Sequence, residues 1–581
     1  MQLRRPSDDA TATERAFERH LDADALRPVE VPPLIDVDAV IAGIGDNATR
    51  GAATAAHRPF EVEERASVHA FFEAYLARLL EIHPDSSFRL GVHPHPRSIG
   101  DYGDAADIRW LLLARDAARI LREWPGADRL PVHDRIDRAA LLGHVEMSLR
   151  WQHTPDLAHL DEIDRWFDAF VVLADVPCCP AADRIAAATA RLRELPGHLR
   201  RVIDLLDVPP KARVLATAET LDAADEYLES YSRHWRAAPE DAVAQLSSAL
   251  APAREALTEA AGRLRNAIAP KANGSIAIGA ANTALTLRVG LHLPLDARTL
   301  YEQALDELRD AHDDMRAAFH RTQNTLTADV RDPSEMQIRE LRAACSAWIT
   351  PLPADEGVVT APLPALWQVQ GASAVYLDPG PLAKASAGVV YLGESSVPEG
   401  PSGRDYADFV RRHTLAHETY PGHRLQAVAS RAACRLRRFI DDRVLAEGWA
   451  VYAEDLLHES NGCVDGGLDD WTRAEERAGY ASGLMTELLL ATGTLSEAEL
   501  AAHLLETGWT EATPEQVGAI AARALYSLGY SVGRNEIFRL RHIEEGRLGT
   551  AFDLRAFHAK LLAAGPISPR LIEAEWAAQG R

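Results

Sequence analysis

Hydrophobic residues recur at helical spacing along most of this chain. Val68, Phe71, Tyr75 and Leu79 follow one another at intervals of three or four residues, which is the period of one face of an amphipathic helix. Pro84 predicts the end of that helix, because proline disfavours helical geometry at the residue before it. The same spacing predicts further helices over residues 108–124, 135–151, 183–206, 215–235, 242–269 and 296–325. Asp296 lies where the N-cap of the last of these helices is expected.

The pattern changes near residue 350. Four prolines between residues 351 and 364 exclude a long helix there, and two short apolar runs, 374–377 and 389–392, predict strands. From residue 407 the helical period returns almost to the end of the chain. The sequence therefore predicts a mainly α fold with one small β-sheet.

Three regions are expected along the chain. Residues 1–60 form a poorly ordered or extended segment, residues 61–349 a helical region, and residues 350–581 a region with the small sheet and the C-terminal helices. No repeat and no Gly/Ser-rich linker separates these regions. We therefore expect one continuous body with two lobes around a cleft.

Composition narrows the possible partners and the compartment. The chain has 581 residues, 47% of them hydrophobic, and a net charge of −24, which argues against nucleic acid and anionic membranes as partners. No apolar run approaches the roughly 18 residues of a membrane helix, and the N-terminus turns acidic where an export signal would be apolar. Five scattered cysteines, without a Cys-x-x-Cys pair, favour a reducing compartment. We expect a cytoplasmic protein.

One segment carries the residue types of a zinc hydrolase. His417 and His423 offer two imidazole ligands, and Glu418 offers a carboxylate that can take a proton from water. The histidines are six residues apart, so a regular helix would direct them about 120° apart. Pro421 and Gly422 lie between them, and a kink or bulge at this point would bring the two imidazoles together.

A zinc site with two histidines usually takes a carboxylate as its third protein ligand. Glu447 lies in a helical stretch 24 residues after His423, which is enough chain for one helix, a turn and an antiparallel partner. Glu454 shares the helical face of Glu447 and is either a hydrogen-bond acceptor for a ligand imidazole or a competing ligand. His413 lies one turn before His417, and we interpret it as a supporting or packing residue rather than a ligand.

These segments resemble a large bacterial family that is known as a domain of unknown function and is grouped with the zincin-like metallopeptidases of the gluzincin type. His-Glu-Thr-Tyr-Pro-Gly-His at 417–423 and Glu-Gly-Trp-Ala-Val-Tyr-Ala-Glu at 447–454 carry the resemblance. Weaker matches are Tyr-Ser-Val-Gly at 530–533 and Phe-Asp-Leu-Arg-Ala-Phe-His at 552–558.

The resemblance implies a zincin-like helical fold with a small β-sheet next to the metal-binding helix. It also implies one Zn²⁺ ion held by His417, His423 and Glu447, with Glu418 as general base in peptide-bond hydrolysis. The family carries Pro-Gly-Gln-Ala just before the tyrosine of its Tyr-x-x-Gly element, whereas residues 524–529 read Ala-Leu-Tyr-Ser-Leu-Gly here. We expect the adjoining wall of the pocket to recognise something unusual.

Peptide hydrolysis needs further groups that bind the substrate. Tyr530 is the first candidate to donate a hydrogen bond to the oxyanion, and Tyr526 is the second. The strand at 389–392, which contains Tyr391, could pair with an extended peptide at an open edge. Arg534 and Arg541 are candidates for holding a substrate carboxylate.

The leading hypothesis is a zinc-dependent peptidase that acts on short peptides or peptide-like amides. A zincin-fold protein that binds a ligand without hydrolysis is a second hypothesis, although Glu418 argues against it because binding alone needs no general base. An amide hydrolase dedicated to one biosynthetic metabolite is the third, and the altered segment 524–529 is the feature that favours it.

Overall fold

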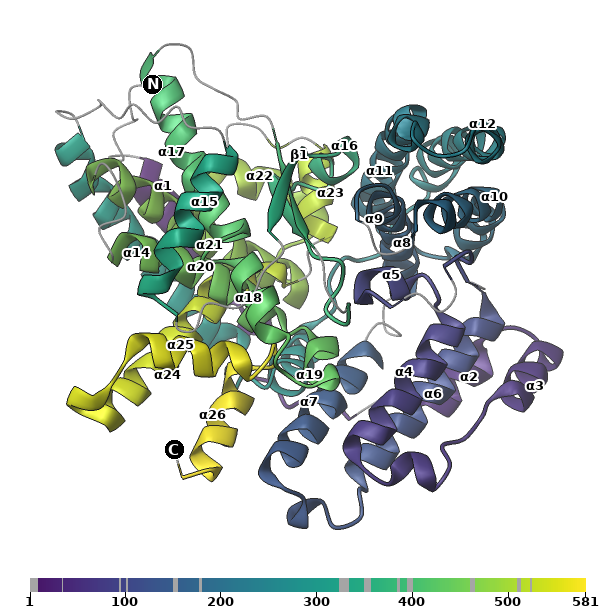
Figure 1. Ribbon diagram of the computed structural model, residues 1–581, viewed down its shortest axis with the longest axis horizontal. Helices are drawn as coiled ribbons and strands as arrows, with labels where there is room; N and C mark the ends of the chain where they lie inside the picture. Colours follow the sequence, from purple (N-terminus) through teal and green to yellow (C-terminus); the bar gives the residue numbers. More distant parts are fainter. Residues whose placement is uncertain are drawn as a thin grey trace.

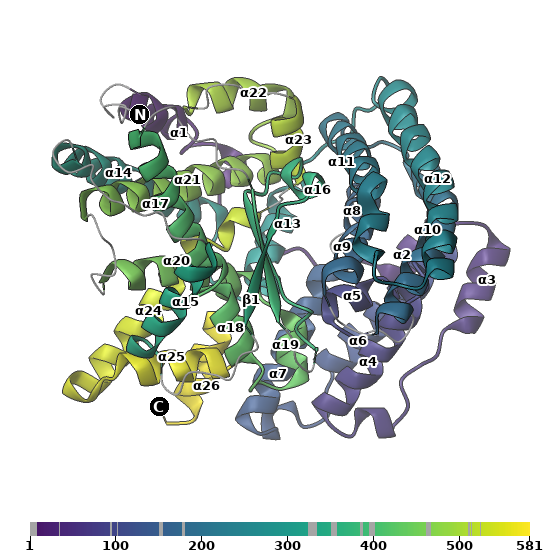
Figure 2. The same ribbon diagram turned by 45° about the horizontal axis from the view of Figure 1, so that its top comes forward.

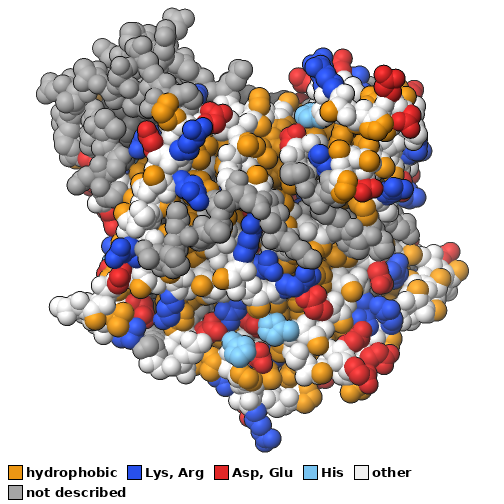
Figure 3. All heavy atoms as spheres, viewed as in Figure 1, with side chains coloured by type: hydrophobic (Ala, Val, Ile, Leu, Met, Phe, Trp, Pro, Cys, Tyr) orange, Lys and Arg blue, Asp and Glu red, His pale blue; other side chains and the backbone are white. Residues whose placement is uncertain are grey.

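The computed structural model is mainly helical and contains one three-stranded sheet (Figure 1). It describes residues 9–33, 35–92, 96–100, 103–149, 155–176, 180–322, 334–349, 357–383, 387–393, 401–459, 466–508, 512, 514–522 and 525–580. Among these residues, no helix is both long enough and apolar enough to cross a membrane. Acidic and basic side chains are interspersed over the described part of the face shown in Figure 3.

The first layer of helices surrounds one apolar core, at the lower right of Figure 1. It contains α2 (Val37–Gly43), α3 (Asn47–Ala56), α4 (Val68–Ile82), α5 (Ser86–Leu90), α6 (Asp104–Arg122) and α7 (Val132–Ser148). Helix α4 begins after Ser67, whose hydroxyl accepts a hydrogen bond from the Ala70 amide, and it ends just before His83-Pro84 as predicted.

A second group of helices packs around its own core above this layer. It contains α8 (Pro155–Trp166), α9 (Asp168–Asp175), α10 (Ala181–Leu205), α11 (Lys211–Ser230) and α12 (Glu240–Arg263). Figure 2 shows that the longest of these helices run side by side on the side of the molecule opposite α17 and α20.

The rest of the chain forms the larger half of the molecule (Figures 1 and 2). One of its cores joins α1 (Asp9–Glu18), α14 (Ala297–Thr322), α21 (Gly466–Thr492), α22 (Glu497–Glu506) and α23 (Pro514–Ala522), and α13 (Ala280–Leu285) packs against α14 and α21. The other joins α15 (Ser334–Ala344), α17 (Pro401–Glu418), α18 (His423–Ser430), α20 (Arg443–Glu459), α24 (Ser531–Leu548), α25 (Leu554–Ala563) and α26 (Pro569–Ala578). The short helices α16 (Ala365–Gln368) and α19 (Arg435–Ile440) pack against the first two cores.

Helix α14 crosses the expected boundary between the N-terminal and C-terminal regions. Asp296 caps it by accepting a hydrogen bond of 2.8 Å from the Thr299 amide, as the sequence predicts. The helix then packs along α21, so the chain on either side of residue 349 shares one core. The three-region division stays a prediction.

Residues 1–60 contain three helices in their described part, where the sequence indicated poor order or extended chain. The carboxylates of Asp36 and Asp46 cap α2 and α3. Phe17, on α1, is completely buried. The segment thus has local N-caps and buried aromatic side chains at Phe17 and Phe60, whereas the expectation rested on its prolines and small residues.

The sheet stands between the α8–α12 group and the C-terminal helices (Figure 2). Its strands are β1 (Val358–Pro362), β2 (Ala374–Leu377) and β3 (Gly388–Leu392), in the order β1-β3-β2, with β3 parallel to β1 and antiparallel to β2. Strand β1 was not predicted because its proline falls within it, and a proline is tolerated there at a sheet edge. Side chains of β3 alternate between the two sides: Val389 and Tyr391 join the core of the α8–α12 group, and Val390 joins the core of α17 and α20.

Candidate metal centre

The two histidines are brought together by a break in the chain between α17 and α18. Helix α17 ends at Glu418 and α18 begins at His423. Gly422 comes so close to the preceding turn that a Cβ atom there would lie 1.8 Å from the carbonyl oxygen of His417. Only glycine fits this turn without a shift of the backbone. The predicted distortion at Pro421-Gly422 is therefore a full break between two helices rather than a kink within one.

Trp449 ties this break to helix α20. Its indole nitrogen donates a hydrogen bond of 2.8 Å to the carbonyl oxygen of Pro421, and its ring is buried. Tyr452 lies one turn further and donates a hydrogen bond to Nε2 of His558, whose Nδ1–H donates to the carbonyl oxygen of Trp348. Trp449 thus holds α20 against the turn that positions His423, and Tyr452 connects α20 to His558 of a later helix.

His417, His423 and Glu447 converge at the wall of a cavity. Glu447 Oε2 lies 3.6 Å from Nε2 of His417 and 3.3 Å from Nε2 of His423. The two imidazole rings are 4.8 Å apart between centroids and nearly perpendicular. One ligand atom from each residue lies within 4.8 Å of the others, as a shared cation requires.

Two glutamates adjoin this group in different ways. Glu454 Oε1 accepts a hydrogen bond of 2.6 Å from Nδ1 of His417. Of the two roles considered for Glu454, this contact is that of an acceptor for the imidazole of a candidate ligand. Glu418 is nearly buried, lines the same cavity and accepts a hydrogen bond of 2.8 Å from the backbone N–H of Tyr376 on β2.

Charge is concentrated around the imidazoles. Burial alone would lower the pKa of His417, but hydrogen bonds to Glu447 and Glu454 outweigh it and hold that pKa well above its usual value. Burial would raise the pKa of Glu447, but His423 and His417 hold it well below its usual range. The group is therefore a strongly anionic pocket whose charge is balanced by protons or by a cation.

Helices α20 and α24 cross in direct backbone contact beside the ligands. A Cβ atom at Gly448 would lie 2.3 Å from the carbonyl carbon of Gly533, and one at Gly533 would lie 2.1 Å from the carbonyl oxygen of Val444. This contact brings the turn before α24, with the 3-10 helix η9 (Tyr526–Leu528), against Glu447. The close contact of the two helices explains why glycine occurs at position 448 in the segment 447–454 and at position 533 in the segment 530–533.

The two candidate tyrosines have different surroundings. Tyr526 donates a hydrogen bond of 2.6 Å to Oε1 of Glu447, so its hydroxyl orients a candidate ligand. The Tyr530 ring stacks on Tyr480 of α21, with centroids 4.6 Å apart, and lies 6.4 Å from the His417 ring. Both tyrosines line the cavity.

The segment 524–529, where the sequence departs from the resemblance, is anchored by α21. Glu487 accepts hydrogen bonds of 2.8 Å from both the amide and the hydroxyl of Ser527. Leu525 adopts a left-handed conformation, which turns the chain into η9. Ala524 lies outside the described residues.

His413 does not reach the three ligand residues. It is buried, and its Nε2 is 2.7 Å from Oδ1 of Asp469, whose other carboxylate oxygen contacts Nδ1 of His458. Its Nδ1 lies 3.8 Å from Glu476, and burial together with the neighbouring Glu454 raises the pKa of Glu476 well above its usual value. His413 thus belongs to a chain of carboxylates and imidazoles behind His417.

Three candidate substrate-binding residues face away from the cavity. Tyr391 is buried and donates a hydrogen bond of 2.7 Å to Asp175, because its position on β3 directs it into the α8–α12 core. Arg534 pairs with Asp455, and Arg541 with Glu459 and Glu545. The proposed pairing of a peptide with an open edge of β3 is also wrong, because β3 is the central strand.

The cavity has a volume of about 1460 Å³ and contains groups that the sequence did not single out. Tyr376 presents its backbone N–H on the outer edge of β2, and Glu476 and Tyr480 lie one turn apart on α21. Glu476 and Tyr480 could have been found in the sequence from the helical spacing of polar residues along α21. Arg89 of α5 has its side chain exposed, and no ion-pair partner for it is found among the described residues.

Solved structures of similar fold include the following two proteins. A candidate lipoprotein of unknown function from Shewanella oneidensis superposes with a TM-score of 0.64 at 17% identity, over 88% of this chain and 100% of that chain. A candidate lipoprotein from Colwellia psychrerythraea gives a TM-score of 0.67 at 16% identity, over 88% of this chain and 99% of that chain. At these identities the likeness shows a shared fold. No curated protein matches the chain.

The prediction of a cytoplasmic location is wrong on this comparison, because both proteins of similar fold are described as lipoproteins. The prediction rested on the scattered cysteines and on the acidic first residues. A chain of this length buries enough apolar surface to fold without disulfides in any compartment, so the cysteine pattern carried little information.

A comparison with known protein families covers the segments that carry the resemblance. The sequence pattern of one bacterial family matches residues 84–575, which include His417, His423, Glu447 and the helices that pack around them. That match spans well over half of the chain. The chain therefore belongs to the family of bacterial proteins of unknown function called DUF885.

Proposed function

We propose that this protein is a zinc-dependent hydrolase that cleaves amide bonds of short peptides or peptide-like molecules, with a metal centre of the zincin, gluzincin-type kind. The observation that carries the proposal is the convergence of His417, His423 and Glu447 on one point of the cavity wall, with Glu418 lining the same cavity. Two imidazoles, a ligand carboxylate and a separate carboxylate base are the groups that such a hydrolase needs.

The donor set fits one zinc ion. Ligand atoms at zinc–nitrogen and zinc–oxygen bond lengths of about 2.0–2.2 Å in a tetrahedral arrangement lie roughly 3.3–3.5 Å apart. The separations of 3.3 and 3.6 Å between Glu447 and the two imidazoles match this spacing. When bound, zinc would supply a Lewis acid that polarises the substrate carbonyl and makes water more acidic.

The surrounding side chains support distinct roles. The Tyr376 amide holds one carboxylate oxygen of Glu418, so the side chain is oriented to accept a proton from water and to pass it to the leaving amine. Glu454 and Tyr526 orient His417 and Glu447 through hydrogen bonds of 2.6 Å. Tyr530 is the proposed donor to the developing oxyanion, because it lines the cavity with its ring 6.4 Å from that of His417.

The substrate is proposed to be an extended peptide of a few residues. The cavity volume of about 1460 Å³ exceeds the ~300–1,000 Å³ of pockets that hold drug-sized molecules. Edge strand β2 offers backbone groups on the side that faces Glu418, so a peptide could add there as a further strand. Arg89 replaces Arg534 and Arg541 as the proposed partner of a substrate carboxylate.

The test combines metal analysis with cleavage of a mixed peptide library by the wild-type protein and by Glu418→Gln. We expect one zinc ion in the candidate centre, cleavage by the wild type, and a loss of at least about a hundredfold in the variant, which keeps the metal. Glu459→Gln serves as the control, because Glu459 lies on helix α20 but pairs with Arg541 outside the cavity.

Two outcomes would count against the proposal. Failure of the centre to bind zinc would overturn the ligand assignment, and full activity of Glu418→Gln would overturn the proposed base. Zinc binding without cleavage of any peptide would instead favour a non-hydrolytic binding protein or a hydrolase dedicated to one metabolite.

A further inference from the structure

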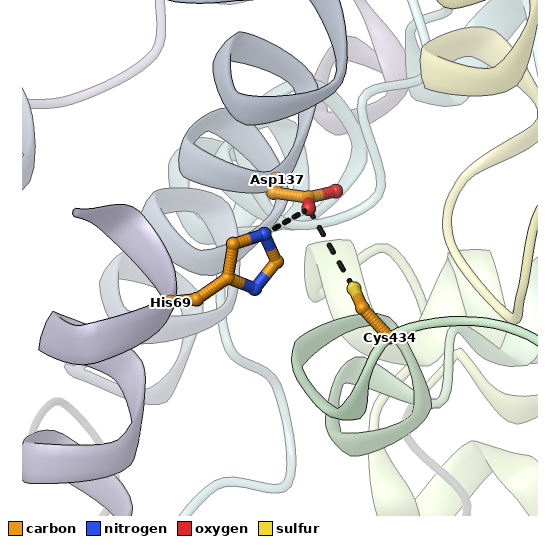
Figure 4. A group of neighbouring side chains, drawn as sticks. All are labelled: His69, Asp137 and Cys434. Carbon is orange, nitrogen blue, oxygen red and sulfur yellow. Dashed lines mark hydrogen bonds and ion pairs between the residues drawn. The ribbon is translucent and has the colours of Figure 1, made fainter.

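A second group of metal-ligand side chains shares no residue with the first centre and does not line its cavity. It combines His69 of α4, Asp137 of α7 and Cys434, the residue that precedes α19. Nε2 of His69 is 3.2 Å from Oδ2 of Asp137, and Sγ of Cys434 is 3.6 Å from the same oxygen. Figure 4 shows the imidazole and the thiol directed toward this one carboxylate from opposite sides.

The carboxylate at the middle of the group is held rigidly. Asp137 is 2% exposed, and its other oxygen accepts a hydrogen bond of 2.6 Å from Nε of Arg437. Arg437 is fixed in turn by two hydrogen bonds, of 2.8 and 2.9 Å, to Glu575. Oδ2 of Asp137 is therefore fixed in position toward His69 and Cys434, while Arg437 and Glu575 balance each other's charge.

A fourth possible ligand is close by. Asp134 lies one turn before Asp137 on α7, and its Oδ1 is 3.6 Å from Nε2 of His69 and 3.1 Å from Nε2 of His133. It lies outside the group of three residues whose ligand atoms are all within 4.8 Å of one another. With Arg437 and Glu575 in balance, the two aspartates leave an excess of negative charge beside an imidazole and a thiol. A divalent cation would neutralise that charge.

The spacing and the donor types favour zinc. Bond lengths of about 2.3 Å to sulfur and 2.0–2.2 Å to nitrogen and oxygen place tetrahedral ligand atoms roughly 3.3–3.6 Å apart. The separations of 3.2 and 3.6 Å lie within about 0.1 Å of this range. Thiolate with imidazole and carboxylate suits zinc, whereas calcium and magnesium prefer oxygen ligands alone.

We propose that His69, Asp137 and Cys434, with Asp134 as the fourth ligand, bind one structural zinc ion. Four protein ligands leave no open position for a substrate, so the role of this ion is to connect elements. It would join α4 and α7 of the first helical layer to the segment before α19. That segment follows α18, the helix that begins with the candidate ligand His423.

Sulfur distinguishes this site from the first one in an experiment. Co²⁺ bound to a thiolate gives an intense near-ultraviolet charge-transfer absorption, and the group at His417, His423 and Glu447 contains no sulfur. The protein used is the full chain with His417→Ala and His423→Ala, so that the first centre is lost. We expect one equivalent of Co²⁺ to produce the absorption and one equivalent of Zn²⁺ to abolish it.

Further substitutions identify the ligands. Cys434→Ser should remove the absorption, and His69→Ala should weaken Co²⁺ binding more than about tenfold, since loss of even an indirect partner of a ligand costs that much. The His69 side chain is 39% exposed, so its replacement leaves the fold intact. Cys345→Ser, at a cysteine buried in another core, is the control and should keep the absorption.

The proposal fails if the absorption is absent, if it persists in Cys434→Ser, or if His69→Ala binds Co²⁺ as tightly as the parent does. A second measurement guards against misfolding of the cysteine variant. Zn²⁺ should raise the unfolding temperature of the parent and leave that of a folded Cys434→Ser protein unchanged. An equal rise in both proteins would overturn the site.

Discussion

Glu454 accepts a hydrogen bond from Nδ1 of His417 and thereby fixes which nitrogen of that imidazole faces Glu447. Glu447 and Glu454 lie two turns apart on α20, so one helix contacts both nitrogens of His417. A histidine held in this way presents a defined tautomer and ring orientation to a cation.

Replacing Glu454 should weaken zinc binding without removing a ligand. In Glu454→Gln the neutral amide oxygen accepts a weaker hydrogen bond from His417, so we expect zinc affinity to fall by about 10–100-fold. Competition with a chelator of known affinity measures this change. Glu459→Gln, on the same helix, should bind zinc as the wild type does, and an equal loss in both variants would contradict the role of Glu454.

The crossing of α20 and α24 should tolerate no side chain. In Gly533→Ala the new methyl group would meet the carbonyl oxygen of Val444, so we expect the free energy of unfolding to fall by about 1–3 kcal/mol and zinc affinity to decrease. Gly546 lies on the same helix with nothing within 4 Å of an added Cβ. Gly546→Ala should raise the free energy of unfolding by up to about 1 kcal/mol, and denaturant titrations compare the two.

Arg89 should matter only for substrates with a free carboxylate. Loss of a hydrogen bond to a charged group costs about 1.5–3 kcal/mol, so Arg89→Met should raise KM by roughly 10–100-fold for peptides with a free C-terminus. The same peptides with an amidated C-terminus should show little change. Arg119→Met removes an exposed arginine of α6 as the control. Equal effects on both peptide series would exclude this role.

The free energy of unfolding should decrease in mild acid because of buried histidines. Burial lowers the pKa of His558 to about 4. Its neutral imidazole accepts a hydrogen bond from Tyr452 at Nε2 and donates one from Nδ1 to the carbonyl oxygen of Trp348. The unfolded chain has a histidine pKa near 6.5 and takes up the proton first. The stabilisation is therefore complete above pH ~6.5 and is lost as the pH falls toward 4, by roughly 3 kcal/mol.

Denaturant titrations between pH 7 and pH 4 measure this loss, and His558→Gln should show a smaller one. His503 has its pKa lowered to about 4 by burial as well, so the variant should retain part of the dependence. An unchanged pH profile in His558→Gln would show that His558 is not among the responsible groups.

The helical period predicted most of the helices because each of them buries one continuous apolar face. The start or end of a helix was predictable where a single residue type determines the backbone geometry, as at Gly422, Asp296 and Pro84. Strand β1 was not predicted because its five residues include a proline. The order of the strands could not be derived from two apolar runs.

The convergence of the candidate ligands was predictable because they lie on adjoining segments. The substrate-binding residues were not, because their directions depend on packing between distant elements. Tyr391 is turned away by the register of β3, and Arg534 is captured by Asp455 of another helix. Arg89 lies more than three hundred residues before the ligands and enters the cavity only through the tertiary fold.

The walls of the large cavity are anchored in separate apolar cores. Trp367 belongs to the core of the α8–α12 group, Leu308 to the core of α14 and α21, and the ligand helices to a third. Strand β3 links two of these cores, because Tyr391 packs in one of them and Val390 in the other. The width of the cavity therefore depends on how these cores pack against one another.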